Sequence, residues 1–282
     1  MAFRELRTLW FQLTGTLCNL ACHHCLNASG PRAPWLAGLG ADEVRRHLAD
    51  AVALGVKEIY FTGGEPFLHP ELLPLLEEAL AVAPTTVLTN GTLIDAVAAD
   101  RLAALAAASP YSLEIRVSID GTTADENDAI RGRGSFARAV NAMRHLDARA
   151  LYPIVTLTEI AARAGEPSIY DRARDLLTSL GLSKVRVKIL PLFATGRWRG
   201  DGEPRRLTED LLAGFDVSSL QCTEAGVVAA GGIYCCPIRA GLPAGRIEAR
   251  SLGEAGARVH RIRLDHPACF TCYETGVSCR NF

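Results

Sequence analysis

The sequence lacks the features that mark membrane-spanning, secreted and nucleic-acid-binding chains. No apolar run in its 282 residues approaches the roughly 18 to 20 that a membrane span needs. The first residues contain no small-residue cleavage site of a secretory signal. The formal net charge is -1, which gives no overall attraction to DNA, RNA or an anionic membrane. Because 49% of the residues are hydrophobic, we expect a folded cytoplasmic protein without membrane association.

The middle of the chain lacks cysteine altogether. The nine cysteines fall into two groups, the first being Cys18, Cys22 and Cys25 and the second being Cys222, Cys235, Cys236, Cys269, Cys272 and Cys279. An odd number of thiols in a chain without a secretory signal does not suit a disulfide framework. Clustered thiols in a cytosolic protein indicate metal or redox chemistry instead.

Short β-branched segments alternate with amphipathic helical patterns over the first two thirds of the chain. Six strands are expected, at Leu9–Thr14, Lys57–Thr62, Thr85–Thr89, Leu113–Asp120, Pro153–Thr158 and Lys184–Leu190. Between them, Gly55 ends one helix, Ser135 caps another, and Ser168 with Asp171 forms an approximate capping box before a helix that Gly181 follows. Six consecutive βα units predict an α/β fold with a parallel sheet and right-handed crossovers. Since a whole TIM barrel has eight units, six predict a partial one.

The character of the sequence changes after about Leu192. Gly196, Gly200, Gly202 and Pro204 mark a linker, and the later sequence is rich in Gly, Cys and Arg without a clear period. We therefore expect a partial barrel at residues 1–204 and a small cysteine-rich module at residues 205–282.

The first cysteine group directly follows the first expected strand. Its spacing, Cys18-x3-Cys22-x2-Cys25, lets three thiolates on one loop converge on an inorganic centre. Structural zinc takes four protein ligands, whereas an iron–sulfur cluster on three thiolates leaves one iron open. His23 or His24 could complete a zinc site, so the spacing alone leaves both possibilities open.

A second motif, Gly63-Gly64-Glu65-Pro66, follows the second expected strand. Glycine lets the backbone approach a ligand closely, and a carboxylate beside it can hold an ammonium group. A tight turn is the alternative interpretation of this tetrapeptide.

Together these motifs resemble the radical S-adenosylmethionine (radical SAM) superfamily. The two motifs above are followed by Thr89-Asn90-Gly91, by Val117-Ser118-Ile119-Asp120-Gly121, and by Arg131-Gly132-x-Gly134-Ser135-Phe136. The resemblance covers about residues 8–192 and implies a six-stranded partial βα barrel. All the motifs then lie at the C-terminal ends of strands, where βα barrels build their active sites.

The resemblance also implies a role for individual residues. A 4Fe–4S cluster would be held by Cys18, Cys22 and Cys25, and its open iron would be chelated by S-adenosylmethionine (SAM). The methionine amino group of SAM would be received by Gly63, Gly64 and Glu65. Its carboxylate would meet Ser118 and Arg131, and its ribose would lie near Asn90. His24 stands where the family usually has an aromatic residue, and it remains a ring that can stack.

The second cysteine group resembles the twitch and SPASM modules that follow many radical SAM barrels and bind auxiliary 4Fe–4S clusters. Its Cys-x2-Cys-x6-Cys run is shorter than that of a full SPASM module, which favours a twitch with one auxiliary cluster. The expected ligands are Cys222, Cys236, Cys269 and Cys272. Cys235 could replace Cys236, and Cys279 is a spare thiol or an alternative ligand. A structural zinc site with four thiolates is the other interpretation.

The resemblance implies an oxidoreductase-type enzyme. An external donor of the flavodoxin or ferredoxin type would reduce the first cluster, and SAM would be cleaved to methionine and a 5′-deoxyadenosyl radical that abstracts a substrate hydrogen. The auxiliary cluster would assist an oxidative modification of a natural-product peptide or a small molecule, by dehydrogenation, cross-linking or bond formation. The first strand begins near residue 9, which leaves no room before it for a leader-binding domain and weakens the peptide interpretation.

Two other functions stay open. A non-catalytic iron–sulfur electron-transfer protein could use the same barrel, but it would not need Gly63–Pro66, Ser118 or Arg131 beside the cluster. A nucleic-acid-modifying enzyme of the same superfamily is favoured only by the stretch Arg239–Arg263, which a solvated surface explains equally well.

Strand periodicity gives one prediction that is independent of the family. Polar residues alternate with apolar ones at Trp10, Gln12 and Thr14, at Glu114, Arg116, Ser118 and Asp120, and at Arg186 and Lys188. Since the helix-facing side of a barrel is apolar, this set should face the lumen. Buried charges need partners. We expect Lys188, nearest the C-terminal end of its strand, to act as a catalytic residue that meets an anionic group of substrate or cofactor. An ion pair with Glu114 is the alternative.

Overall fold

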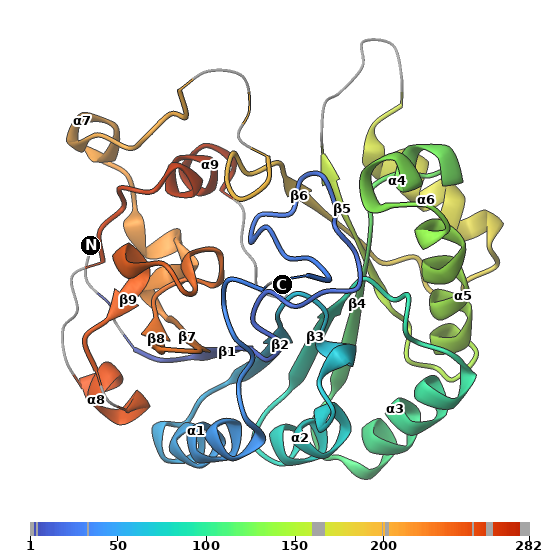
Figure 1. The fold of residues 1–282 in the computed structure, drawn as a ribbon, viewed down its shortest axis with the longest axis horizontal. Helices are drawn as coiled ribbons and strands as arrows, with labels where there is room; N and C mark the ends of the chain where they lie inside the picture. The colour runs from blue at the N-terminus through green and yellow to red at the C-terminus, as the bar shows by residue number, and fades with distance from the viewer. Residues whose placement is uncertain are drawn as a thin grey trace.

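Parallel strands alternate with helices through the first two thirds of the chain in the computed structural model (Figure 1). The structure describes residues 3, 5–32, 34–159, 167–198, 200, 203–249, 251–257 and 262–276. The strands of this part are β1 (Thr8–Gln12), β2 (Glu58–Thr62), β3 (Thr85–Thr89), β4 (Leu113–Ile119), β5 (Ile154–Glu159) and β6 (Val187–Pro191). The helices are α1 (Ala41–Leu54), α2 (Leu72–Leu80), α3 (Ala96–Ala108), α4 (Ala124–Arg131), α5 (Ser135–Asp147) and α6 (Ile169–Ser179), with a 3-10 turn, η1 (Pro66–Leu68), before α2.

All six expected strands are confirmed, with ends shifted by up to three residues. Two of the expected helix ends are confirmed, because Gly55 adopts the left-handed conformation after α1 and the Ser168 hydroxyl accepts a hydrogen bond from the Asp171 N–H at 3.1 Å. The expected cap at Ser135 is wrong. Gly134, with φ 75°, is the capping residue of α5, and the Ser135 hydroxyl donates instead to Asp128 Oδ1 at 3.0 Å.

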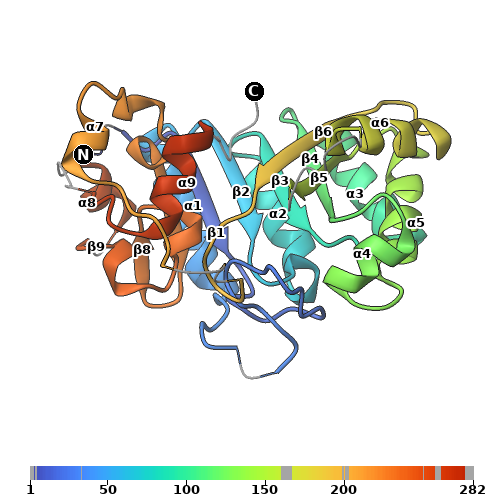
Figure 2. The same ribbon diagram turned by 90° about the horizontal axis from the view of Figure 1, so that it is seen from above.

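The sheet has nine strands in the order β6-β5-β4-β3-β2-β1-β7-β8-β9. Neighbours from β6 to β7 (Ala225–Ala229) run parallel, and the antiparallel strands β8 (Gly232–Tyr234) and β9 (Arg246–Ile247) follow. The later helices are α7 (Glu209–Leu212), α8 (Leu252–Ala257) and α9 (Pro267–Thr275). The C-terminal segment thus extends the sheet from β1, on the side away from β4–β6 (Figure 2). Among the described strands the sheet ends at β6 and β9, so it is a partial, open barrel.

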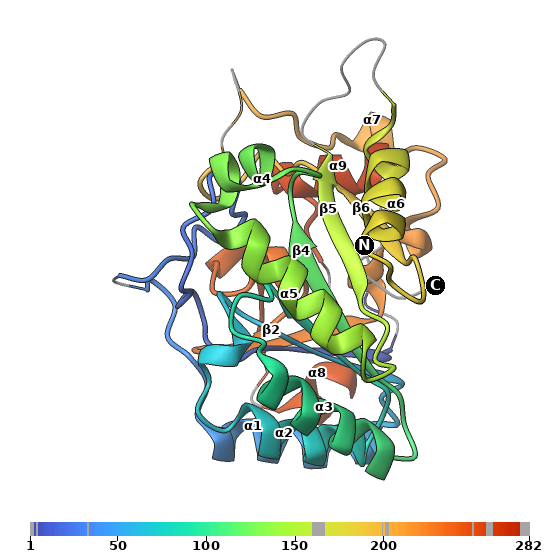
Figure 3. The same ribbon diagram turned by 90° about the vertical axis from the view of Figure 1, so that its right-hand side faces the viewer.

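The two faces of the strands pack differently. Leu9 and Phe11 lie in the large core between sheet and helices, where Val44 and Leu48 of α1 are also buried, and α5 packs on the outer side of β4 (Figure 3). On the opposite face Trp10 stacks on the Tyr60 ring, with 4.1 Å between centroids. Apolar burial on the helix-facing side stabilises the fold by roughly 25 cal/mol per Å². The cluster on the inner face combines Trp10 and Tyr60 with smaller aliphatic side chains such as Val227.

Among the described residues, no helix is both long enough and apolar enough to span a bilayer.

Candidate active site

The loops at the C-terminal ends of the strands surround a cavity of about 230 Å³. Nine of the expected site residues line it, namely Cys18, Cys22, His24, Cys25, Gly63, Gly64, Asn90, Ser118 and Arg131. These residues come from five separate motifs along the chain. The structure therefore brings together the groups that the sequence suggested.

The three-cysteine loop holds its sulfur atoms with backbone and side-chain donors. Cys18 Sγ accepts from the Leu20 N–H at 3.4 Å and from Asn90 Nδ2 at 3.7 Å, and Cys25 Sγ accepts from the Ser29 N–H at 3.2 Å. Burial raises the pKa of the Cys18 thiol to about 12 and also raises the pKa of Cys22. Such thiols ionise when a cationic metal centre stabilises the thiolate. N–H···S bonds of this kind are typical of iron–sulfur ligation, so the donor set fits a cluster.

The Gly63-Gly64 pair has no room for side chains. A Cβ on Gly63, whose φ is 146°, would lie 2.3 Å from Thr14 Oγ1, and one on Gly64 would lie 2.1 Å from the Leu17 carbonyl oxygen. The backbone of β2 therefore continues close against the start of the cysteine loop and also lines the cavity. Larger residues here would separate the two loops.

Glu65 lies beneath the cavity, with its side chain fully buried. Its Oε1 accepts from the Phe67 N–H at 3.1 Å and from Thr89 Oγ1 at 2.7 Å, and its Oε2 accepts from the Asn90 N–H at 2.8 Å. Burial raises the pKa of this carboxyl to about 6, although the three donors oppose the increase. These hydrogen bonds tie the end of β2 to the end of β3. The expected contact of the carboxylate with the methionine amino group stays a prediction, because an ionised carboxylate can accept about four hydrogen bonds.

Asn90 ties the end of β3 to the cysteine loop. Its Nδ2 donates to Asn19 Oδ1 at 2.8 Å, and its Oδ1 accepts from the Thr92 N–H at 2.9 Å. The residue lines the cavity and also approaches Cys18. Its position beside the ribose of SAM stays a prediction.

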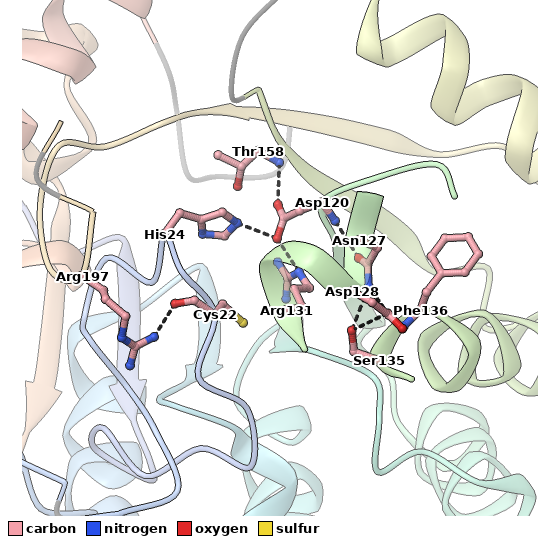
Figure 4. A network of polar contacts seen from close by, with 10 residues as sticks. All are labelled: Cys22, His24, Asp120, Asn127, Asp128, Arg131, Ser135, Phe136, Thr158 and Arg197. Carbon is pink, nitrogen blue, oxygen red and sulfur yellow. Dashed lines mark hydrogen bonds and ion pairs between the residues drawn. The ribbon is translucent and has the colours of Figure 1, made fainter. Parts of the chain in front are cut away.

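Asp120, at the end of β4, joins three parts of the site (Figure 4). Its Oδ2 accepts from Arg131 Nε and lies 2.6 Å from His24 Nε2, and its Oδ1 accepts from the Thr158 N–H at 3.2 Å. Burial opposes ionisation of Asp120, but Arg131 and His24 together hold its pKa below the usual value. The sequence motif contained Asp120 without assigning it a role. The sequence feature that could have indicated a role for Asp120 is its position directly after a buried strand, in a chain that offers arginine and histidine side chains as partners for a carboxylate.

The helix that carries Arg131 is fixed by a second carboxylate. Asp128 accepts from the Gly134 N–H, from the Phe136 N–H at 2.9 Å and from the Ser135 hydroxyl (Figure 4). Although desolvation opposes ionisation, these donors lower the pKa of Asp128 to about 2. The turn between α4 and α5 is thereby closed, and Arg131 is held at the cavity.

The polar inner face of the later strands is confirmed for Glu114 and its arginines. Glu114 Oε1 lies 3.3 Å from Arg116 Nε, and its Oε2 lies 2.6 Å from Arg186 Nη2. Lys188 is in register with Thr156, and Thr156 is in register with Ser118. Since Ser118 and Thr156 line the cavity, Lys188 lies on the same inner face of the sheet. Its catalytic role stays a prediction.

A second cavity, of about 50 Å³, lies in the C-terminal segment. The four expected ligands line it together with the alternative ligand, as Cys222, Cys235, Cys236, Cys269 and Cys272. Burial raises the pKa of Cys222 to about 12 and raises the pKa of Cys235 and Cys269. Because both Cys235 and Cys236 face this cavity, the choice between them stays open. Cys279 lies outside the described residues.

Both thiol groups are spread around their cavities. Within the part of the chain that the structure describes, no three His, Cys, Asp or Glu side chains converge on one point as the ligands of a single ion do. Thiols of the two cysteine groups line the two cavities, and His24 also lines the first.

Arg239 is buried beside the second cavity, with 1% of its surface exposed. Its guanidinium donates to the carbonyl oxygens of Arg263, at 2.5 Å, and Ala244, and it lies 3.2 Å from Asp265 Oδ1. This residue therefore does not contribute to a basic surface, as a nucleic-acid interpretation of the stretch Arg239–Arg263 would need.

The sequence matches the profile of the Radical SAM superfamily over residues 13–163. This stretch is more than half of the chain and contains β2 to β5 with every loop that lines the first cavity up to Thr158. The chain belongs to the radical SAM superfamily. Membership gives it the cofactors of the family, a 4Fe–4S cluster and SAM, and the thiols and glycines of the first cavity suit that pair. The cysteine-rich segment after the barrel corresponds to the twitch and SPASM type of module.

Individual relatives cover parts of the chain. A mycofactocin maturase, MftC, from Mycobacterium ulcerans is 38% identical over 132 residues, which are 46% of this chain and 34% of the maturase. A GTP 3′,8-cyclase from Geobacter sulfurreducens is 28% identical over 72% of this chain and 62% of the cyclase. The chain thus spans about a third of the length of the maturase.

A solved structure shows the same fold. The crystal structure of Streptococcus suis SuiB bound to S-adenosylmethionine superposes with a TM-score of 0.63 and 16% sequence identity, covering 85% of this chain and 62% of SuiB. The partial barrel expected from six βα units is therefore confirmed.

Proposed function

We propose that this chain is a radical SAM enzyme that cleaves SAM reductively and removes a hydrogen atom from a natural-product peptide. The observation that carries the proposal is the first cavity, in which three thiols lie beside two glycines, a serine and an arginine. The thiols suit iron, and the other groups suit the charged ends of an amino acid. A non-catalytic electron-transfer protein would need only the thiols.

When bound, the cluster and SAM together supply the 5′-deoxyadenosyl radical that abstracts the hydrogen. Cys18, Cys22 and Cys25 would hold the cluster. Arg131 and Ser118 would bind the carboxylate of SAM, with Arg131 oriented by Asp120. The amino group would meet the backbone of the Gly63-Gly64 pair, since the Glu65 carboxylate is engaged below it.

The remaining inner-face residues would serve the substrate and exclude water. His24, held by Asp120, forms part of the cavity wall, and Asn90 would lie beside the ribose. Lys188, on the same face as Ser118, would meet an anionic group of the substrate. A barrel that holds its reactive site behind such a wall protects a radical from solvent.

The second thiol-lined cavity would hold an auxiliary 4Fe–4S cluster that accepts an electron during an oxidative step. Its ligands would be Cys222, Cys269, Cys272 and one of the adjacent pair Cys235 and Cys236. The donor set supports this assignment, and a structural zinc ion is the competing occupant. A protein of the flavodoxin or ferredoxin type would supply electrons to the first cluster.

The names of relatives support a peptide as substrate. MftC is a mycofactocin maturase, and a further relative, AlbA of Bacillus subtilis, is an antilisterial bacteriocin subtilosin biosynthesis protein that is 29% identical over 66% of this chain. A small-molecule substrate is the second candidate, because the GTP 3′,8-cyclase matches over more of this chain than the maturase does.

The test is anaerobic reconstitution with iron, sulfide and SAM, followed by reduction with dithionite. Formation of 5′-deoxyadenosine would support the enzyme, and its absence from a protein with an intact reduced cluster would favour the electron-transfer alternative. Adding the product of a neighbouring gene as substrate, with mass spectrometry of the product, then separates the two substrate classes. A peptide product lighter by two hydrogens would support oxidative modification.

A further inference from the structure

The segment that follows β6 crosses the three-cysteine loop. The Arg197 guanidinium donates to the carbonyl oxygen of Cys22 and, at 2.6 Å, to that of Ser29, and Figure 4 shows it directed at Cys22. The backbone N–H of Arg197 also donates to the Cys25 carbonyl oxygen at 3.0 Å. One residue, about 170 positions away in sequence, thus satisfies three carbonyls of the loop.

Gly196 lies against the same loop without space between them. A Cβ at this position would lie 2.3 Å from the Leu26 carbonyl oxygen and 2.4 Å from that of Cys25, and its φ of 67° is left-handed. Phe193, three residues earlier, is buried with Leu26 packed against its cluster. The segment therefore contacts the loop through hydrogen bonds on one side and apolar packing on the other.

We propose that Arg197 is a positioning residue that fixes the geometry of the loop around the first cluster. This inference rests on the proposed function, in which the loop holds that cluster. Buried carbonyls without donors are costly, and the rigid planar guanidinium meets two of them at once with donors in a fixed geometry, which the flexible lysine ammonium does not provide. Its positive charge, which lies against the carbonyl of Cys22, also favours the more negative, reduced state of a cluster.

The experiment compares matched variants of the reconstituted full chain. Arg197→Met removes the charge and the hydrogen bonds of the side chain, Arg197→Lys keeps the charge, and Gly196→Ala disturbs the contact without changing charge. Gly200→Ala is the control for backbone strain, because Gly200 has the same left-handed φ, 69°, with nothing within 4 Å of its Cβ position. Arg174→Met, at a half-exposed surface arginine, is the control for loss of charge.

Two measurements report on the cluster without turnover. The first is anaerobic release of iron to a chelator, and the second is the EPR spectrum of the reduced cluster with SAM, including its midpoint potential. We expect Arg197→Met and Gly196→Ala to release the iron of the first cluster about tenfold faster than the unchanged protein, as loss of charge-assisted hydrogen bonds predicts. Arg197→Lys should be intermediate. Only Arg197→Met should lower the midpoint potential.

Release of iron at the unchanged rate from both Arg197→Met and Gly196→Ala would overturn the proposal. Equally fast release from Gly200→Ala would also overturn it, because backbone strain alone would then explain the effect. Circular dichroism checks the fold of each variant; if Arg197→Met unfolds, Arg197→Lys takes its place and must show faster release. If the unchanged protein has no EPR signal that SAM alters, the proposed function itself has failed.

Discussion

Glu65→Ala tests whether the carboxylate of the Gly-Gly-Glu-Pro motif has a structural role, as the hydrogen-bond acceptor that joins β2 to β3, or binds the cofactor. The side chain is fully buried and accepts hydrogen bonds from Phe67, Thr89 and Asn90. Removing it leaves three buried donors without an acceptor. Each such donor costs about 1–3 kcal/mol, so we expect the free energy of unfolding to fall by about 4 kcal/mol or more.

Glu65→Gln is the matched control. The amide oxygen can still accept from Phe67 and Thr89, but the amide NH2 faces the Asn90 N–H, which costs about 1–3 kcal/mol. Against this, the variant removes a buried charge whose pKa is raised to about 6 from 4.5, which is worth about 2 kcal/mol at neutral pH. The two effects nearly cancel, so Glu65→Gln should be within about 1 kcal/mol of the unchanged protein.

The same pKa gives a pH dependence with a definite sign. Because burial raises the folded-state pKa of Glu65, the folded protein binds this proton more tightly than the unfolded chain does. Lowering the pH from 7 through about 6 to 4.5 should therefore increase the stability of the unchanged protein relative to Glu65→Gln, by about 2 kcal/mol. Urea unfolding of the metal-free proteins at several pH values measures this difference.

SAM binding separates the two roles. If the carboxylate has the structural role, the affinity of Glu65→Gln for SAM should stay within about threefold of that of the unchanged protein. Glu65→Ala should then lose both stability and the bound first cluster. A Glu65→Ala protein with unchanged stability, an intact cluster and SAM affinity weaker by roughly tenfold or more would refute the reasoning. The carboxylate would then reach the amino group, as the sequence resemblance implied.

Three further predictions concern the cavities. Reconstituted protein should contain about eight irons, and replacing Cys18, Cys22 and Cys25 by Ala should leave about four and abolish 5′-deoxyadenosine formation; four irons with one zinc in the unchanged protein would exclude the auxiliary cluster. Asp120→Asn should weaken SAM binding by roughly tenfold, measured by titration of the EPR signal, because it loosens Arg131 and His24; unchanged affinity would remove Asp120 from the site. Lys188→Met should lower substrate turnover at least tenfold while iron content and unfolding stay unchanged, and full turnover would contradict its role.

The strands and the position of the site were predictable from the sequence for a local reason. Alternation of apolar and polar residues sets the two faces of a strand, and the chemistry-bearing motifs directly follow strands whose ends share one edge of the sheet. Asn90 and Ser118 therefore came together with the thiols in the structure, although 72 and 100 residues separate them from Cys18. The cap of α5 was predicted wrongly because Gly134 and Ser135 are both suitable capping residues. The Ser135 hydroxyl donates to Asp128, and Gly134 is the capping residue.

What could not be predicted are the partners of buried charges and of loop carbonyls. The sequence places Glu65 beside the site, but only packing shows that its oxygens accept hydrogen bonds from Thr89 and Asn90. Arg197 has no motif around it, and its bonds to Cys22 and Ser29 depend on how the chain returns after β6. A carbonyl on a loop can be satisfied by a donor from any part of the chain. Residues of this kind determine how rigidly a site is held, and three-dimensional structure is the first level at which they become visible.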